Sequence, residues 1–154
     1  MRYKLFTLMA LLALSMLSVA CAAQGVSGAP VDSAVSSESN GVEDQSGLIE
    51  ALQAADAQVE MGDSIEQAFF SVPGQILKVN GVDVQVFEYE SAEAMGTEAS
   101  QVSEDGSSIG TSMVNWVEAP HFFRSGRLLV LYVGEDAVVL DLLKGVLGKQ
   151  FAGR

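Results

Sequence analysis

Residues 75–90 read QILKVNGVDVQVFEYE, and they carry the clearest structural signal of the chain. The pair Asn80-Gly81 at the centre is typical of a two-residue type I′ hairpin turn, in which both central residues need a positive φ. The register that follows pairs Val79 with Val82, Leu77 with Val84, and Gln75 with Val86. We therefore predict an antiparallel hairpin with Lys78 and Asp83 on its wetter face and five apolar residues on the other: Leu77, Val79, Val82, Val84 and Val86.

A second hairpin is predicted over residues 122–133, about Ser125-Gly126. Its later strand, residues 128–133, reads LLVLYV and is apolar on both faces, which is typical of a central strand. A further strand is expected over residues 113–118, and the following Ala119-Pro120 interrupts it. Residues 61–63 are expected to form a turn, and residues 69–72 a brief strand that Pro73-Gly74 ends.

Three helices are predicted around these hairpins. The first covers residues 47–59 with Ser46 as its N-cap, and the second follows Ser91 with Ala92, Met95, Ala99 and Val102 on one stripe. The third covers residues 135–147, with Asp136 near its start and Gly148 as its C-cap. The order α-β-β-α-β-β-α predicts an α+β fold, in which an antiparallel sheet of two hairpins has its helices packed mainly on one face.

The first twenty residues are typical of an export signal. Two positive charges, Arg2 and Lys4, precede an apolar run from residue 5 to residue 19. This run is shorter than the ~20 residues that cross a bilayer, so a signal is favoured over a stop-transfer helix. The only cysteine of the chain, Cys21, follows directly.

The segment Leu17-Ser18-Val19-Ala20-Cys21 resembles the bacterial lipobox, in which small residues precede the cysteine that receives lipid. The resemblance implies that Cys21 is lipidated and becomes the mature N-terminus. The chain departs from the pattern at Ser18, because lipoboxes usually have Leu at this position. Cleavage by an ordinary signal peptidase near Val19 or Ala20 is the alternative.

Composition divides the chain into three parts. Residues 22–47 are rich in Ser, Gly, Ala, Asn, Asp and Glu, which is typical of a flexible linker. We therefore predict a signal peptide over residues 1–20, the lipidated Cys21 with a tether over residues 21–46, and a small α+β domain over residues 47–154.

The exported part is strongly acidic. All 20 acidic residues follow Cys21, so loss of Arg2 and Lys4 with the signal takes the formal charge from −12 to −14. Such a charge repels phosphate backbones and anionic lipid surfaces. We therefore expect neither nucleic-acid binding nor a basic surface that docks on a membrane. We expect the protein to attach to the membrane only through the lipid on Cys21.

The folded part resembles small bacterial lipoproteins of unknown function. The resemblance rests on residues 105–111 (DGSSIGT), on Met113-Val114-x-Trp116-Val117, and on residues 120–128 (PHFFRSGRL). These stretches cover about a seventh of the chain. They support the lipoprotein assignment and imply no activity.

No catalytic, metal or cofactor motif is recognised. His121 is the only histidine, so a catalytic triad would have to use it with Ser107, Ser108, Thr111 or Ser112, and the spacing selects none of them. We expect His121 to be a hydrogen-bonded residue beside Pro120. The acidic residues form no calcium loop, and the glycines form no phosphate or dinucleotide loop. We therefore expect no catalytic residue, no metal and no cofactor.

One stretch is a candidate binding surface. Aromatic residues and arginines are enriched at interfaces, and this otherwise acidic chain places five of them close together: Trp116, Phe122, Phe123, Arg124 and Arg127. The alternative is that the aromatics are core residues and the arginines solubilise a turn.

These observations predict a lipid-anchored protein on the extracytoplasmic side of the cell membrane or outer membrane. Its domain is expected to be a non-catalytic binding or accessory module for a protein or small molecule. One alternative is an envelope hydrolase that uses His121 with a nearby Ser or Thr. Another is a structural or assembly lipoprotein with an exposed apolar patch around Phe69 and Phe70.

Overall fold

The computed structural model describes residues 41–154, so the predicted signal, Cys21 and most of the predicted tether lie outside the described residues. The elements follow one another in the order α1 (Gln45–Ala54), β1 (Val59–Ile65), β2 (Gly74–Val79), β3 (Val82–Glu88), α2 (Ala92–Ala99), β4 (Ser108–Ile109), β5 (Ser112–Met113), β6 (Pro120–Ser125), β7 (Leu128–Val133), α3 (Ala137–Leu147) and β8 (Ala152–Gly153). Between residues 41 and 154, no helix has the length and apolar character needed to cross a membrane.

The α+β class and the antiparallel sheet are confirmed. Six strands form one sheet in the order β1-β2-β3-β7-β6-β8, and β4 pairs with β5 in a separate ribbon. The predicted order of two hairpins and three helices was too simple, because β1, the β4–β5 ribbon and β8 add strands to it. Two of these additions, β4–β5 and β8, involve strands of two residues, which are too short to show a period in the sequence.

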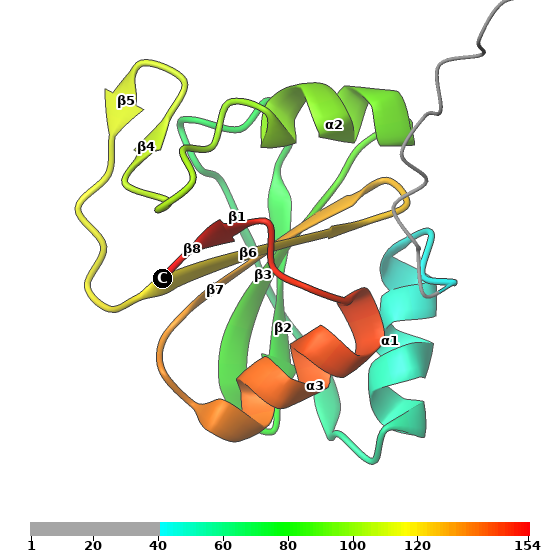
Figure 1. Cartoon of the computed structure of the whole chain (residues 1–154). Helices are drawn as coiled ribbons and strands as arrows, with labels where there is room; N and C mark the ends of the chain where they lie inside the picture. The colour runs from blue at the N-terminus through cyan, green and yellow to red at the C-terminus, as the bar shows by residue number, and fades with distance from the viewer. Residues whose placement is uncertain (1–40) are drawn as a thin grey trace, which may run out of the picture. The chain divides into compact units, whose positions relative to one another are not determined.

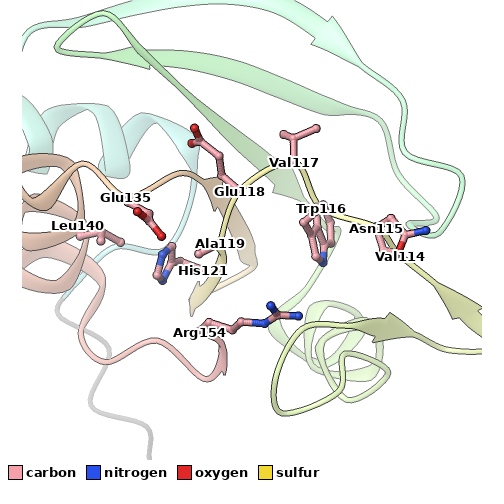
Figure 2. Close-up of a pocket in the computed structure, with 10 residues that line it drawn as sticks. All are labelled: Val114, Asn115, Trp116, Val117, Glu118, Ala119, His121, Glu135, Leu140 and Arg154. Atoms are coloured by element: carbon pink, nitrogen blue, oxygen red, sulfur yellow. The ribbon is translucent and has the colours of Figure 1, made fainter.

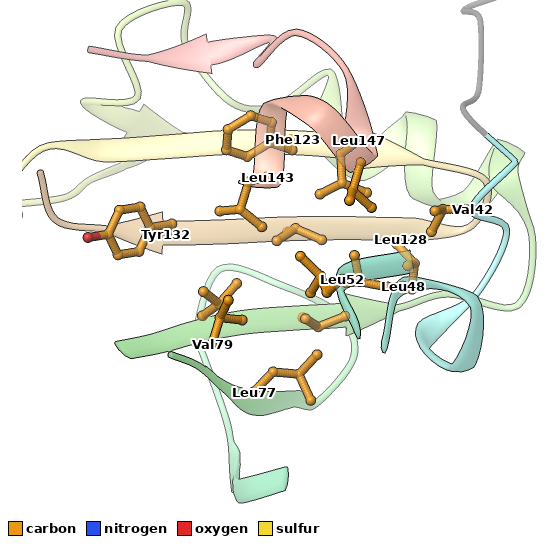
Figure 3. Close-up of a cluster of buried hydrophobic side chains, with 14 of the residues drawn as sticks. Val42, Leu48, Leu52, Leu77, Val79, Phe123, Leu128, Tyr132, Leu143 and Leu147 are labelled. Carbon is orange, nitrogen blue, oxygen red and sulfur yellow. The ribbon is translucent and has the colours of Figure 1, made fainter. Parts of the chain in front are cut away.

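Helices cover both faces of the sheet, which corrects the prediction that they pack mainly on one (Figure 1). One core cluster joins α1 and α3 to the sheet through residues such as Leu52, Leu143 and Leu128 (Figure 3). A second cluster joins α2 and the β4–β5 ribbon to the opposite face, with Met95, Ile109 and other residues around the fully buried Phe122. The sheet is therefore the middle of three layers.

The hairpin of β2 and β3 has the predicted register. Val79 pairs with Val82, Leu77 with Val84, Gln75 with Val86, and Lys78 with Asp83. The turn residues Asn80 and Gly81 have φ values of 52° and 83°, as a type I′ turn requires. Lys78 Nζ lies 2.7 Å from Asp83 Oδ1 on the exposed side.

The second hairpin is formed by β6 and β7. Ser125 pairs with Leu128, so the turn residues are Gly126 and Arg127, one position later than predicted. β7 lies between β3 and β6, which confirms its central position.

The helix boundaries differ most at the first helix. α1 begins at Gln45 and ends at Ala54. It begins there because the Asp44 side chain, rather than Ser46, accepts a hydrogen bond from the Gly47 amide at 2.9 Å. The residues predicted for its last turn lead into β1 instead. α2 has the predicted N-cap Ser91, and α3 has Asp136 and Gly148 as its caps.

Two predicted strands are not formed as expected. Residues 69–72 are a turn and bends, and the strand expected over residues 113–118 is reduced to its first residue in β5. Conversely, the turn expected over residues 61–63 lies inside β1, an edge strand with a bulge between Met61 and Ser64. The bulge removes the strict alternation that a sequence pattern needs.

The folded part begins before residue 47. Residues 42–44, here called the strap, lie against the β6–β7 turn. The Ser125 hydroxyl donates to the Val42 carbonyl at 2.7 Å, and the Arg127 amide donates to the Glu43 carbonyl at 3.0 Å. Val42 itself is 2% exposed. Residues 42–44, which the composition assigned to the tether, therefore pack against the folded part.

Candidate functional site

Two adjoining hollows open beside the first residues of β6. One has a volume of about 550 Å³ and is lined by Val114, Asn115, Trp116, Val117, Glu118, Ala119, His121, Glu135, Leu140 and Arg154 (Figure 2). The other, of about 530 Å³, is lined by His121, Lys144, Gly148, Lys149, Gln150 and Arg154. We call the first the Trp116 hollow and the second the lysine hollow. Both include His121 and Arg154, so we treat them as two parts of a single site.

His121 holds together the elements around this site. It is 6% exposed, and its Nε2 lies 3.1 Å from the Gly134 carbonyl oxygen. A carbonyl only accepts, so Nε2 carries a proton and donates it. Nδ1 lies 2.9 Å from Gln150 Oε1, and the ring stacks on Tyr132 with centroids 6.0 Å apart. The ring thus links β6 to the segments before and after α3.

The position of Arg154 depends on the short strand β8. Gly153 pairs with His121, and the Arg154 amide donates to the Pro120 carbonyl at 3.1 Å. Gly153 has a φ of 109°, and a Cβ at this position would overlap the Pro120 carbonyl. A glycine is therefore needed for the close pairing that brings Arg154 beside His121, with its side chain pointing toward Trp116 (Figure 2).

Trp116 forms a fixed wall of its hollow. The indole Nε1–H donates to the Gly106 carbonyl at 2.6 Å. The ring packs edge to face on Phe122 and Phe69, with ring centroids 5.9 and 6.0 Å apart. The wall is apolar, whereas Glu118, Glu135 and Arg154 bring charges to the same hollow. Such a mixed lining suits a small ligand with an apolar and a polar part.

The five residues of the predicted binding surface are not brought together. Phe122 and Phe123 are 0% exposed and belong to the core clusters on opposite faces of the sheet. Arg127 forms ion pairs with Glu88 at 2.6 Å and Asp44 at 3.5 Å. Arg124 lies over the Phe151 ring at 5.1 Å. Of the five, only Trp116 lines the site.

The sequence analysis missed Lys144, Lys149 and Arg154. The two lysines fall near the end of the third predicted helix, where positive charges are common and indicate no binding site. No local pattern could place Arg154, because its neighbours are set by pairing between β8 and β6. Within residues 41–154, no group of three or more His, Cys, Asp or Glu residues is arranged to hold a metal ion.

Comparison with known proteins adds no relative: no family model, no curated protein and no solved structure matches the chain.

Proposed function

We propose that the chain is a bacterial lipoprotein, held by lipid on Cys21 on the extracytoplasmic side of the cell membrane or outer membrane. Its folded part binds a ligand without catalysing a reaction. The lipid anchor is supported by the position of the lone cysteine. It follows directly after an apolar segment that begins with positive charges, and it precedes a polar linker. Such a linker leaves the folded part free to meet ligands near the membrane.

The binding role is supported by the shape of the site at His121. Each hollow has a volume in the range typical of small-molecule sites, about 300–1,000 Å³. Trp116 and Leu140 supply an apolar surface, and Arg154 supplies a cation. These are groups that bind and orient a molecule.

The geometry favours binding over hydrolysis. A histidine that activates a hydroxyl nucleophile needs a free ring nitrogen within hydrogen-bond reach of it. In the described residues the two ring nitrogens of His121 contact the Gly134 carbonyl and the Gln150 side chain instead. A structural lipoprotein with an apolar patch at Phe69 and Phe70 is also less favoured, because Phe70 is only 8% exposed and packs on Phe87.

The anchor is tested by comparing the wild type with Cys21→Ser in a bacterium that processes lipoproteins. Wild type should partition into detergent and carry the mass of acyl chains on Cys21, because two or more chains give stable attachment at ~0.8 kcal/mol per buried CH₂. Cys21→Ser should lose this mass and either stay as unprocessed precursor or be released. Ala23→Ser, which introduces the same hydroxyl two residues away, is the matched control. Unmodified wild type in the soluble fraction would overturn the proposal.

A further inference from the structure

Half of the positively charged residues in the described part of the chain line one hollow. Residues 41–154 contain six Lys and Arg residues, and three of them, Lys144, Lys149 and Arg154, line the lysine hollow. They come from α3, from the turn after it and from the end of β8. No acidic residue lines this hollow, although the same part of the chain has 18 acidic residues.

The other three cations have partners within the fold. Lys78 pairs with Asp83, Arg127 pairs with Glu88 and Asp44, and Arg124 lies over Phe151. In contrast, Lys144, Lys149 and Arg154 form no ion pair with any described residue. Arg154 acts on the Asp105 carboxylate only at longer range, as a minor cause of its lowered pKa. Within residues 41–154, three positively charged residues that line one hollow thus have no ion-pair partner.

The end of a helix does not explain this arrangement. The C-terminus of a helix carries a partial negative charge of about half a unit, which one lysine in its last turn already balances. Lys144 is in that position in α3. Arg154 is placed by β8 pairing, and Lys149 lies beyond the helix C-cap Gly148. The excess positive charge belongs to the hollow.

We propose that the lysine hollow binds a compact oxyanion with two or more negative charges, such as inorganic phosphate. Lysine ammonium groups act as point charges toward such an anion, and the hollow is also lined by Gln150 and Arg154, whose residue types carry N–H donors. The acidic remainder of the protein repels a flat anionic membrane, so a small dissolved anion that enters the hollow is the favoured ligand. This proposal rests on the binding role proposed above and names the class of its ligand.

The test is a titration of the ¹⁵N-labelled mature protein with inorganic phosphate, in neutral detergent at low ionic strength. Amide signals of Gly148, Lys149, Gln150 and Arg154 should shift with a saturable, single-site curve that sodium chloride of equal ionic strength does not reproduce. The double variant Lys144→Gln/Lys149→Gln should weaken binding at least ~10-fold, because charged hydrogen bonds are lost. Lys78→Gln/Arg124→Gln removes the same net charge outside the hollow and should change affinity less than about twofold.

Three results would overturn the anion site: no saturable shift with phosphate, equal shifts with chloride, or an equal loss of affinity in the control pair. Unchanged circular dichroism of both double variants would show that lost affinity is not lost folding. The titration is independent of the Cys21→Ser experiment. A failed titration leaves the lipid anchor standing, and an unlipidated Cys21 leaves the titration valid.

Discussion

Asp105 organises the loop that supports Trp116. Its carboxylate accepts hydrogen bonds from the Ser107 amide at 3.0 Å and the Ser103 hydroxyl at 2.9 Å. These bonds favour the charged form, so the pKa of Asp105 is lowered to about 2, with the Ser107 amide as the largest cause. The next residue, Gly106, supplies the carbonyl that holds the Trp116 indole. One exposed carboxylate thus shapes a wall of the candidate site.

The lowered pKa predicts an acid-sensitive loop. A carboxyl whose pKa is lower in the folded than in the unfolded state stabilises the fold above its ordinary pKa of 3.8, and this contribution is lost as the pH falls through about 2. A ¹³C NMR titration should therefore place the Asp105 midpoint near 2, with faster exchange of the Ser107 amide and the Trp116 indole proton at lower pH. Asp105→Asn should show the faster exchange already at neutral pH. Glu104→Gln is the control, and a wild-type midpoint near 4 would contradict the prediction.

Single residues differed in how far the sequence could place them. His121 was expected to be hydrogen-bonded beside Pro120, and its contacts with Gly134 and Gln150 agree with that interpretation. The aromatic neighbours Phe122 and Phe123 face opposite sides of one strand, so their closeness in sequence did not make a surface. Arg154 was out of reach, because its position results from a strand pairing between distant residues.

Among the elements, those with strong local signals were predicted best. The β2–β3 register follows from Asn80-Gly81 alone, and α3 follows from its apolar face and its caps Asp136 and Gly148. β1 was missed, because a bulge breaks its alternation and none of its residues is fully buried. The helix layer on the second face was missed because nothing local indicates which side of a sheet a helix will cover.

Two glycines with positive φ should respond differently to alanine. Gly81 and Gly126 have φ values of 83° and 52°, and a side chain is strained at both. A Cβ at Gly81 would meet nothing within 4 Å, whereas a Cβ at Gly126 would overlap the Glu43 main chain. Gly81→Ala should therefore lower the free energy of unfolding by roughly 1 kcal/mol, and Gly126→Ala by roughly 1–3 kcal/mol more. Urea denaturation measures both, and equal losses would contradict the assigned contact between the β6–β7 turn and the strap.

For the molecule as a whole, the strap ties the first described residues to the core. Its Val42 belongs to the same core cluster as α1 and α3 (Figure 3). Its Asp44 caps α1 and also contacts Arg127, which in turn pairs with Glu88 of β3. The strap therefore joins the first helix to two neighbouring hairpins. Composition had assigned these residues to the linker, because three mostly polar residues carry too little apolar signal to be recognised as part of a fold.

The strap should accordingly contribute a large share of the stability. A chain that begins at Gly47 loses the burial of Val42, worth ~1.5–3 kcal/mol, and the Asp44 cap, worth ~1 kcal/mol, so its free energy of unfolding should fall by roughly 3 kcal/mol. A chain that begins at Gly41 keeps both and should match the longer protein. Thermal and urea unfolding of the two truncated chains measure the difference.

The same truncations show whether the loss arises from the strap itself. Gly126→Ala is destabilising in part because its Cβ would overlap Glu43. Glu43 is absent from the chain that begins at Gly47. There the loss of stability due to the overlap should disappear, and Gly126→Ala should cost only the strain of the positive φ. A double-mutant cycle between the truncation and Gly126→Ala should therefore give a coupling free energy of roughly 1–3 kcal/mol. Gly81→Ala, whose site is open, should give a coupling near zero in the same cycle. Equal coupling at the two glycines would mean that the truncation weakens the whole sheet rather than removing one local contact.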